Sequence, residues 1–317
     1  MIRNQEAVNS LYRQRNRFII IGLTGRTGAG CTTVSKILSS ESIQKLDLKA
    51  YKTHDFKSAD ERKYSVVYRF MKEENRWKSF NVIEASSVIF SYILEQSFSE
   101  LWEFVERLSK EGRINGLDNL RLRLEEFFDS KDNAEVRLAD TILNSNEQQA
   151  FDSIINKNDN DQEKDISTLE SKIVLFDTIL KQKKNHFREI LQYFIIEKDS
   201  KQDGTKEIFN LYTYFMQTAG NNIRSSGKYN SSERIAGKEI SIAQRIDQII
   251  KYINCYEEKM HPKEERVRIC IDALRNSMEI QYFRDKYRSF YCIAVNTEDY
   301  YRIRRIGTNS LQIKSQG

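Results

Sequence analysis

The stretch Arg17-Phe18-Ile19-Ile20-Ile21-Gly22-Leu23, followed by Thr24-Gly25-Arg26-Thr27-Gly28-Ala29-Gly30-Cys31-Thr32-Thr33, decides how we expect this chain to fold. The first seven residues are a compact β-branched run, typical of a strand buried on both faces of a parallel sheet. A glycine-rich turn comes next, and apolar residues then recur at helical spacing at Val34, Ile37 and Leu38. The order strand, turn, helix predicts the first βα unit of an α/β domain.

Apolar segments near both ends of the chain extend this pattern. Strands are predicted at Phe80–Ile83, Val267–Asp272 and Phe290–Val295, and helices at 87–94 and 277–287. Helices that alternate with apolar strands predict a parallel sheet. We therefore expect an α/β fold with a parallel sheet flanked by helices.

Composition limits the class of protein. The chain has 317 residues, of which 39% are hydrophobic and 31% charged, and this balance excludes both a disordered tail and an integral membrane protein. The apolar run Phe18–Leu23 is far shorter than the roughly 20 residues of a spanning helix, and the polar segment Met1–Arg17 lacks a secretory signal. We expect a cytoplasmic protein with no membrane partner. The net charge is only +5, but residues 266–305 hold nine Lys and Arg against five Asp and Glu, which makes the C-terminal part basic.

The turn matches the Walker A pattern G-x-x-x-x-G-K-[ST] at every fixed position but one, because Cys31 stands in place of the lysine. Glycines let successive N–H groups turn towards a phosphate, and the following helix adds the positive end of its dipole. The lysine serves phosphoryl transfer more than binding. We therefore predict a site for an NTP or dNTP whose phosphates are held by Gly25, Arg26, Thr27, Gly28, Ala29, Gly30, Cys31, Thr32 and Thr33.

Two other interpretations of this turn stay open. The first is a glycine-rich turn that binds nothing. The second is a dinucleotide site, but its G-x-G-x-x-G order is not followed here, and Asp47, the one acidic candidate for a ribose contact, follows a poorly defined strand.

Charged residues elsewhere suit the same site. Gln217–Lys228 carries an arginine between glycines and could close over a ligand, while Asp272 and Arg275 follow a predicted strand, at the edge where open α/β sheets bind ligands. We expect Thr32 and Asp272 near a Mg²⁺, and Arg224 and Arg275 completing the phosphate site. The alternative for each distal residue is a surface charge or a local cap.

Further roles are less defined by the sequence. Arg26 and Lys36 are candidates to replace the missing lysine. Glu84 follows the predicted strand Phe80–Ile83 and is either a base or substrate ligand or an exposed carboxylate at the start of a helix, and we favour the second interpretation. The sequence identifies no catalytic residue.

Gly22–Thr33, Met216–Gly227, Ile271–Asn276 and the strand Phe290–Val295 resemble, in the same order, the N-terminal P-loop module of bacterial anti-phage deoxycytidylate deaminases. The resemblance implies a P-loop NTPase fold of the nucleotide-kinase type. In that family the module precedes a zinc-dependent domain that converts deoxycytidine nucleotides to deoxyuridine nucleotides and so starves phage replication.

The domain organisation follows from the same elements. Residues 101–143 and 169–196 show the spacing of amphipathic helices, which indicates a helical insertion and not an independent β domain. We expect one P-loop kinase-like domain over residues 1–317, with its core in 16–95 and 208–310 and the helical insertion at about 96–207.

The zinc chemistry of the family has no counterpart in this sequence. A zinc deaminase needs a His or Cys ligand followed two residues later by Glu, and then P-C-x-x-C. His54, His186 and His261 are not followed by Glu at that spacing, and P-C-x-x-C does not occur. We expect no zinc in this chain, so a zinc deaminase would be a further domain or a partner chain.

Three functional hypotheses result. The favoured one is a nucleotide-binding module that senses or regulates within an anti-phage nucleotide-depletion system, by binding without turnover. The second is an active nucleoside or nucleotide kinase with an unusual Walker A loop. The third is a scaffold that recruits a regulatory RNA or protein through the basic C-terminal part. We also expect a homo-oligomer.

Overall fold

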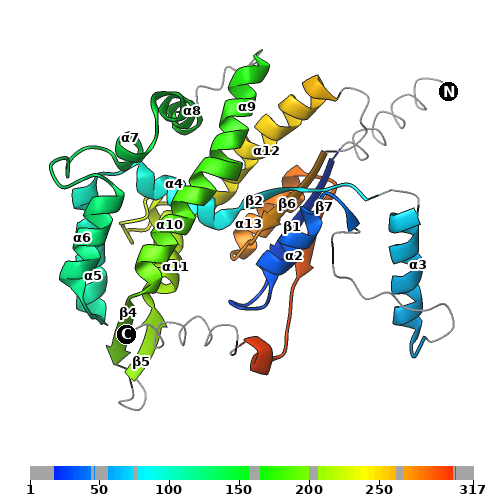
Figure 1. The fold of residues 1–317 in the computed structure, drawn as a ribbon, viewed down its shortest axis with the longest axis horizontal. Helices are drawn as coiled ribbons and strands as arrows, with labels where there is room; N and C mark the ends of the chain where they lie inside the picture. The colour runs from blue at the N-terminus through cyan, green and yellow to red at the C-terminus, as the bar shows by residue number, and fades with distance from the viewer. Residues whose placement is uncertain are drawn as a thin grey trace.

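The computed structural model describes residues 18–43, 46, 56–73, 77–156, 165–199, 206–261, 267–302 and 304. A parallel sheet with the strand order β2-β6-β1-β7 lies beside a large helical region (Figure 1). Its strands are β1 (Phe18–Thr24), β2 (Asn81–Glu84), β6 (Val267–Asp272) and β7 (Phe290–Ala294). All four strands were predicted from their apolar runs, and the expected α/β class with a parallel sheet flanked by helices is confirmed.

The register brings the carboxyl ends of the strands to one edge. Leu23 of β1 and Glu84 of β2 are both opposite Asp272, the last residue of β6. Parallel strands need crossover connections, and helices supply them here. The turn after β1 and the segment after β6 therefore leave the sheet side by side.

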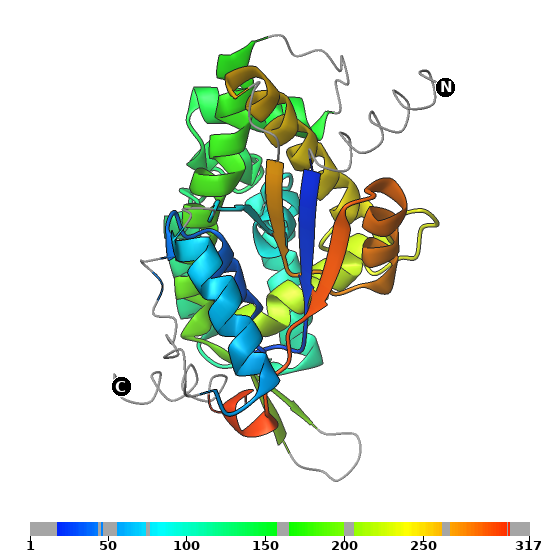
Figure 2. The same cartoon turned by 90° about the vertical axis from the view of Figure 1, so that its right-hand side faces the viewer.

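Both faces of the sheet are covered. Cys270 belongs to one buried cluster, with Leu23, and its neighbours Ile269 and Ile271 to another, so alternate residues of β6 point to opposite faces. The helix α2 (Cys31–Leu38) packs on β1 and β6, α4 (Ala85–Leu94) and α12 (Ser241–Met260) on β6, and α13 (Ser277–Lys286) on β7 (Figure 2).

The other helices are mostly in the middle of the chain. They are α3 (Ala59–Glu73), α5 (Phe98–Glu111), α6 (Leu117–Phe127), α7 (Leu138–Ile142), α8 (Ser145–Ile155), α9 (Ile166–Val174), the π-helical segment η2 (Leu175–Ile179), α10 (Leu180–Gln192) and α11 (Leu211–Ser226). No described helix is both long and apolar enough to span a bilayer.

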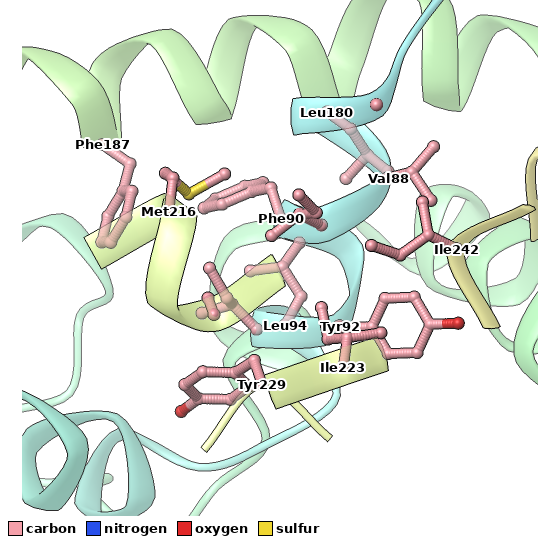
Figure 3. Packing of buried hydrophobic residues seen from close by; sticks show 14 of the residues in the cluster. Val88, Phe90, Tyr92, Leu94, Leu180, Phe187, Met216, Ile223, Tyr229 and Ile242 are labelled. Carbon is pink, nitrogen blue, oxygen red and sulfur yellow. The ribbon is translucent and has the colours of Figure 1, made fainter. Parts of the chain in front are cut away.

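The helix α4 is the centre of the helical region, because nine of its ten residues are buried. Phe90 of α4 packs against Phe187 of α10, with ring centroids 5.5 Å apart, and Phe187 packs at the same distance on Phe215 of α11 (Figure 3). The buried cluster that contains these rings also includes Ile20 and Ile83 of the sheet. Sheet and helices thus share one hydrophobic core.

The middle of the chain, where a helical insertion was expected, also contains strands. A small antiparallel sheet, of order β3-β4-β5, forms from β3 (Arg113–Ile114), β4 (Ile195–Asp199) and β5 (Lys206–Asn210). Ile196 pairs with Phe209 in this sheet. The β-branched and aromatic residues of β4 and β5 favour strands, and β4 was missed because its first two residues continue the helical spacing predicted for residues 169–196.

Candidate functional site

Glycines shape the turn between β1 and α2. Gly28 and Gly30 have φ values of 82° and 107°, in the left-handed region that residues with a Cβ avoid. At Gly25 a Cβ would lie 2.5 Å from the Val295 carbonyl oxygen, so only glycine fits there. The Ala29 N–H donates to the Arg26 carbonyl over 2.9 Å, which closes the turn. These constraints make residues 25–30, here called the glycine loop, a defined structure.

The helix that follows directs its positive end towards the glycine loop. The α2 helix begins at Cys31, and no side chain caps its N-terminus within the described part of the chain. The N–H groups of Thr33 and Val34 donate to the Gly30 carbonyl, at 3.0 Å each, so the glycine loop runs directly into the helix. A helix N-terminus of this kind favours an anion.

Asp272 is the acidic group next to the glycine loop. Its carboxylate is buried and accepts a 2.9 Å hydrogen bond from the Ser35 hydroxyl of α2. Burial raises the pKa of Asp272, and hydrogen bonds from Ser35 and Thr32 partly oppose that rise. The structure thus brings Thr32 and Asp272 together, as the sequence analysis expected of a magnesium site. Hydroxyl and carboxylate oxygens are ligands that Mg²⁺ accepts, so this pair fits the ion.

Arg275 lies against the glycine loop. Its Nη1 donates to the Gly25 carbonyl over 3.0 Å and approaches the Thr27 hydroxyl at 3.4 Å. The preceding residue is anchored as well, because the Leu274 N–H donates to the Leu23 carbonyl over 2.8 Å. An exposed guanidinium is therefore held against the glycine loop, beside the predicted phosphate position.

Arg224 has a different setting from the one expected. It belongs to α11, so the segment around it is a helix and not a loop that closes over a ligand. Its Nε donates to Glu279 Oε1 over 2.8 Å, and the two side chains are only 13% and 1% exposed. Glu279 Oε2 also accepts from the Arg275 N–H at 3.4 Å. Arg224 therefore supports the Arg275 segment through Glu279.

The residues at or near the position of the missing Walker A lysine differ in burial and in charge. The Cys31 thiol is buried beside Leu23 and Cys270, and burial, followed by the charge of Asp272, raises its pKa, so Cys31 brings no positive charge. Arg26 is exposed and pairs with Asp299 at 3.2 Å. Lys36 and Thr33 are exposed on α2.

A cluster that the sequence analysis missed lies at the end of β2. Glu84 is not an exposed carboxylate: it is 15% exposed and accepts from Lys184 Nζ, while Lys181 Nζ lies 3.2 Å from its other oxygen. Lys184, itself 7% exposed, also reaches the Ser86 hydroxyl at 3.3 Å. Burial opposes ionisation of Glu84, but the two ammonium groups outweigh it and lower the pKa.

The favoured prediction for Glu84 is therefore wrong, and the reason is tertiary. The lysines come from α10, about a hundred residues further along the chain. The only sequence signal is their spacing, since residues three apart share a helix face. A cavity of about 40 Å³ borders Glu84, and the Ser87 hydroxyl that lines it has no hydrogen-bond partner among the described residues. That volume suits water, not a nucleotide.

Two of the histidines have partners that are not part of the glycine loop. The His186 ring packs on Phe127 at 4.8 Å, and His261 Nδ1 lies 3.0 Å from Glu257. Within the described ranges, no group of three or more His, Cys, Asp or Glu side chains could hold a metal ion. His54 and Asp47 fall outside the described residues.

Comparisons of the chain with protein-family models, with curated proteins and with solved structures found no match. The geometry of the site alone therefore bears on what this chain binds.

Proposed function

We propose that this chain is a nucleotide-binding module of the P-loop type. The observation that supports it best is the hydrogen bonding of Asp272, at the end of the strand next to β1, with Thr32 and Ser35 in the first half of α2. A strand, a glycine loop and a helix alone would also be compatible with a turn that binds no ligand. A buried carboxylate held beside the loop's threonine adds oxygen ligands where a phosphate-bound Mg²⁺ would need them.

Each part of the site has a distinct role in this proposal. The glycine loop and the start of α2 hold the phosphates of an NTP or dNTP through N–H groups and the helix dipole. Thr32 and Asp272 hold Mg²⁺, which when bound neutralises phosphate charge. Arg275 adds a planar guanidinium suited to a phosphate oxygen pair.

The absence of the loop lysine favours binding over phosphoryl transfer. Cys31 is buried and neutral, so the charge that follows the transferred phosphoryl group is lost from its usual position. Together with the resemblance of its motifs, this supports a sensing or regulatory module of an anti-phage deoxycytidine-nucleotide deaminase system. The zinc deaminase would belong to another domain or chain.

The test is a calorimetric titration with ATP and the four dNTPs, with and without Mg²⁺. Gly28→Val should abolish binding, because a β-branched residue is excluded from the Gly28 backbone conformation. Gly237→Val is the matched control: Gly237 has a φ of 85° but nothing within 4 Å of its Cβ position. Equal binding by the two variants, or no binding by the unmodified chain, would refute the proposal.

The same samples test the kinase hypothesis. Chromatography of ATP incubated with deoxynucleosides or deoxynucleotides should show no ADP and no phosphorylated product if the module only binds. Steady turnover that Gly28→Val removes would show an active kinase instead.

A further inference from the structure

The helical region places a buried lysine side chain at the edge of the sheet where the glycine loop lies. Lys184 is the fifth residue of α10, and its ammonium ends between Glu84 and Ser86, at the carboxyl end of β2. A buried lysine is costly unless it is paired. Glu84 pairs with it, and Lys181, three residues earlier on the same helix, adds a second positive charge that is 40% exposed.

A short chain of contacts connects this cluster to the glycine loop. Glu84 is directly opposite Asp272 in neighbouring parallel strands, which are about 4.8 Å apart. Asp272 in turn accepts a hydrogen bond from Ser35, the fifth residue of α2. Lys184, through its ion pair with Glu84, therefore lies at the strand end next to Asp272. The extended side chain of a lysine is long enough to bridge adjacent strand ends.

The charged side chains at this edge of the sheet are three basic groups and two carboxylates, so positive charge is in excess. At the end of β2, Glu84 pairs with the ammonium groups of Lys184 and Lys181. At the end of β6, Asp272 is followed by Arg275, whose guanidinium donates to the Gly25 carbonyl. Mg²⁺ held by Asp272 would shift this balance towards positive charge. An additional anion at the edge, such as the terminal phosphate of a nucleotide, would then be favoured.

We propose that Lys184, with Lys181 beside it, contacts the terminal phosphate of the bound nucleotide and so replaces the loop lysine in whose position Cys31 stands. The inference rests on the nucleotide-binding function proposed above and narrows its ligand to a nucleoside triphosphate in preference to a diphosphate. Glu84 is a positioning residue that holds Lys184 at the edge when no nucleotide is bound. The helical insertion thereby distinguishes the two nucleotide forms.

The experiment compares the affinities for a triphosphate and its diphosphate, both with Mg²⁺, by calorimetry. Lys184→Met should reduce the preference for the triphosphate about tenfold, the loss expected for one charge-assisted contact. Lys183→Met is the control, because it removes the same charge from the adjacent position of α10. Glu84→Gln should raise triphosphate affinity, since Lys184 is then released from its carboxylate.

Removing Lys184 alone leaves the buried Glu84 with one partner and could unfold the chain. The double variant Glu84→Gln/Lys184→Met removes both charges and should fold while losing the preference. In the unmodified protein, hydrogen exchange of residues 180–187 should slow with the triphosphate more than with the diphosphate.

The outcomes separate this inference from the proposed function. No binding of either nucleotide to the unmodified chain overturns both. Binding of both, with a preference that the single or the double variant leaves unchanged, overturns only the role of Lys184. Equal protection of residues 180–187 by the two nucleotides would also overturn that role, and this measurement needs no variant.

Discussion

Glu84 and Asp272 end two neighbouring parallel strands directly opposite each other, and their carboxylates have opposite pKa shifts. Burial raises the pKa of Asp272, whose partners are mainly hydroxyls. Burial also opposes ionisation of Glu84, but two ammonium groups lower its pKa. Glu84 is therefore held ionised by its two ammonium partners, whereas Asp272 is hydrogen-bonded to neutral hydroxyls.

Replacing the buried acid by its amide separates binding from stability. Asp272→Asn should remove the dependence of nucleotide affinity on Mg²⁺, because a metal-ligating charge is lost while the Ser35 hydroxyl still has an oxygen to which it can donate. The variant should also unfold at a higher temperature at neutral pH. The folded-state pKa of Asp272 is raised, so its ionisation disfavours the fold, and this difference should vanish as the pH falls towards 3.8.

Calorimetry with and without Mg²⁺ and thermal melts at several pH values measure both effects. Asp118→Asn, at an exposed position in the first turn of α6, is the control and should change neither. A magnesium dependence that survives in Asp272→Asn would assign the ion to other ligands.

The buried ion pair between Arg224 of α11 and Glu279 of α13 should contribute strongly to the free energy of unfolding. Arg224→Met leaves Glu279, which is 1% exposed, without its ionic partner, and breaking such a pair costs about 3 kcal/mol. The surface pair of Arg121 and Glu125 on α6, with Arg121 50% exposed, should contribute less than about 1 kcal/mol. Urea unfolding of Arg224→Met and Arg121→Met gives the comparison, and similar costs would mean that burial does not strengthen the first pair.

The Glu84 cluster predicts a pH dependence of definite sign. The folded-state pKa of Glu84 lies below its ordinary value of 4.5, so the ionised group stabilises the fold fully above that pH. This contribution is lost as the pH falls through the lower folded-state value. The free energy of unfolding of the unmodified chain minus that of Glu84→Gln should therefore be constant near neutrality and decline in acid. A difference that grows on acidification would contradict the assigned ion pairs.

The thiols should differ in reactivity. Cys292 is exposed, whereas Cys31 and Cys270 are buried, and burial raises the pKa of Cys270 to about 12. A thiol-specific reagent such as a maleimide should label Cys292 first and should label Cys31 and Cys270 only after denaturation. Peptide mass spectrometry at successive times identifies the labelled sites. Early labelling of Cys31 would show that the start of α2 is more open than the structure has it.

The sequence predicted the local structure around the glycine loop. The glycine loop, the strand before it and the helix after it are encoded by neighbouring residues, and so are Asp272 and Arg275 at the end of a recognisable strand. Parallel strands end at one sheet edge, which is why residues some 240 positions apart, such as Thr32 and Asp272, could be placed together. The nucleotide itself stays a prediction.

Contacts that depend on packing escaped prediction. Glu84 looked exposed because nothing near it in sequence indicates Lys184, and only the path of α10 brings the two together. Gly220 belongs to a segment that was expected to close over a ligand, yet in α11 it permits close packing, since a Cβ there would lie 3.1 Å from Ile89 of α4. A sequence does not distinguish a glycine that allows two helices to pack closely from a glycine that adopts a positive φ.

One continuous hydrophobic core extends from Ile20 in β1 to the aromatic rings of α10 and α11. The sheet and the helical region should therefore fold as a single unit. Removing the helical insertion would expose the apolar faces of α4 and α12 that pack against α10 and α9. Shortened versions of this chain should therefore lose solubility.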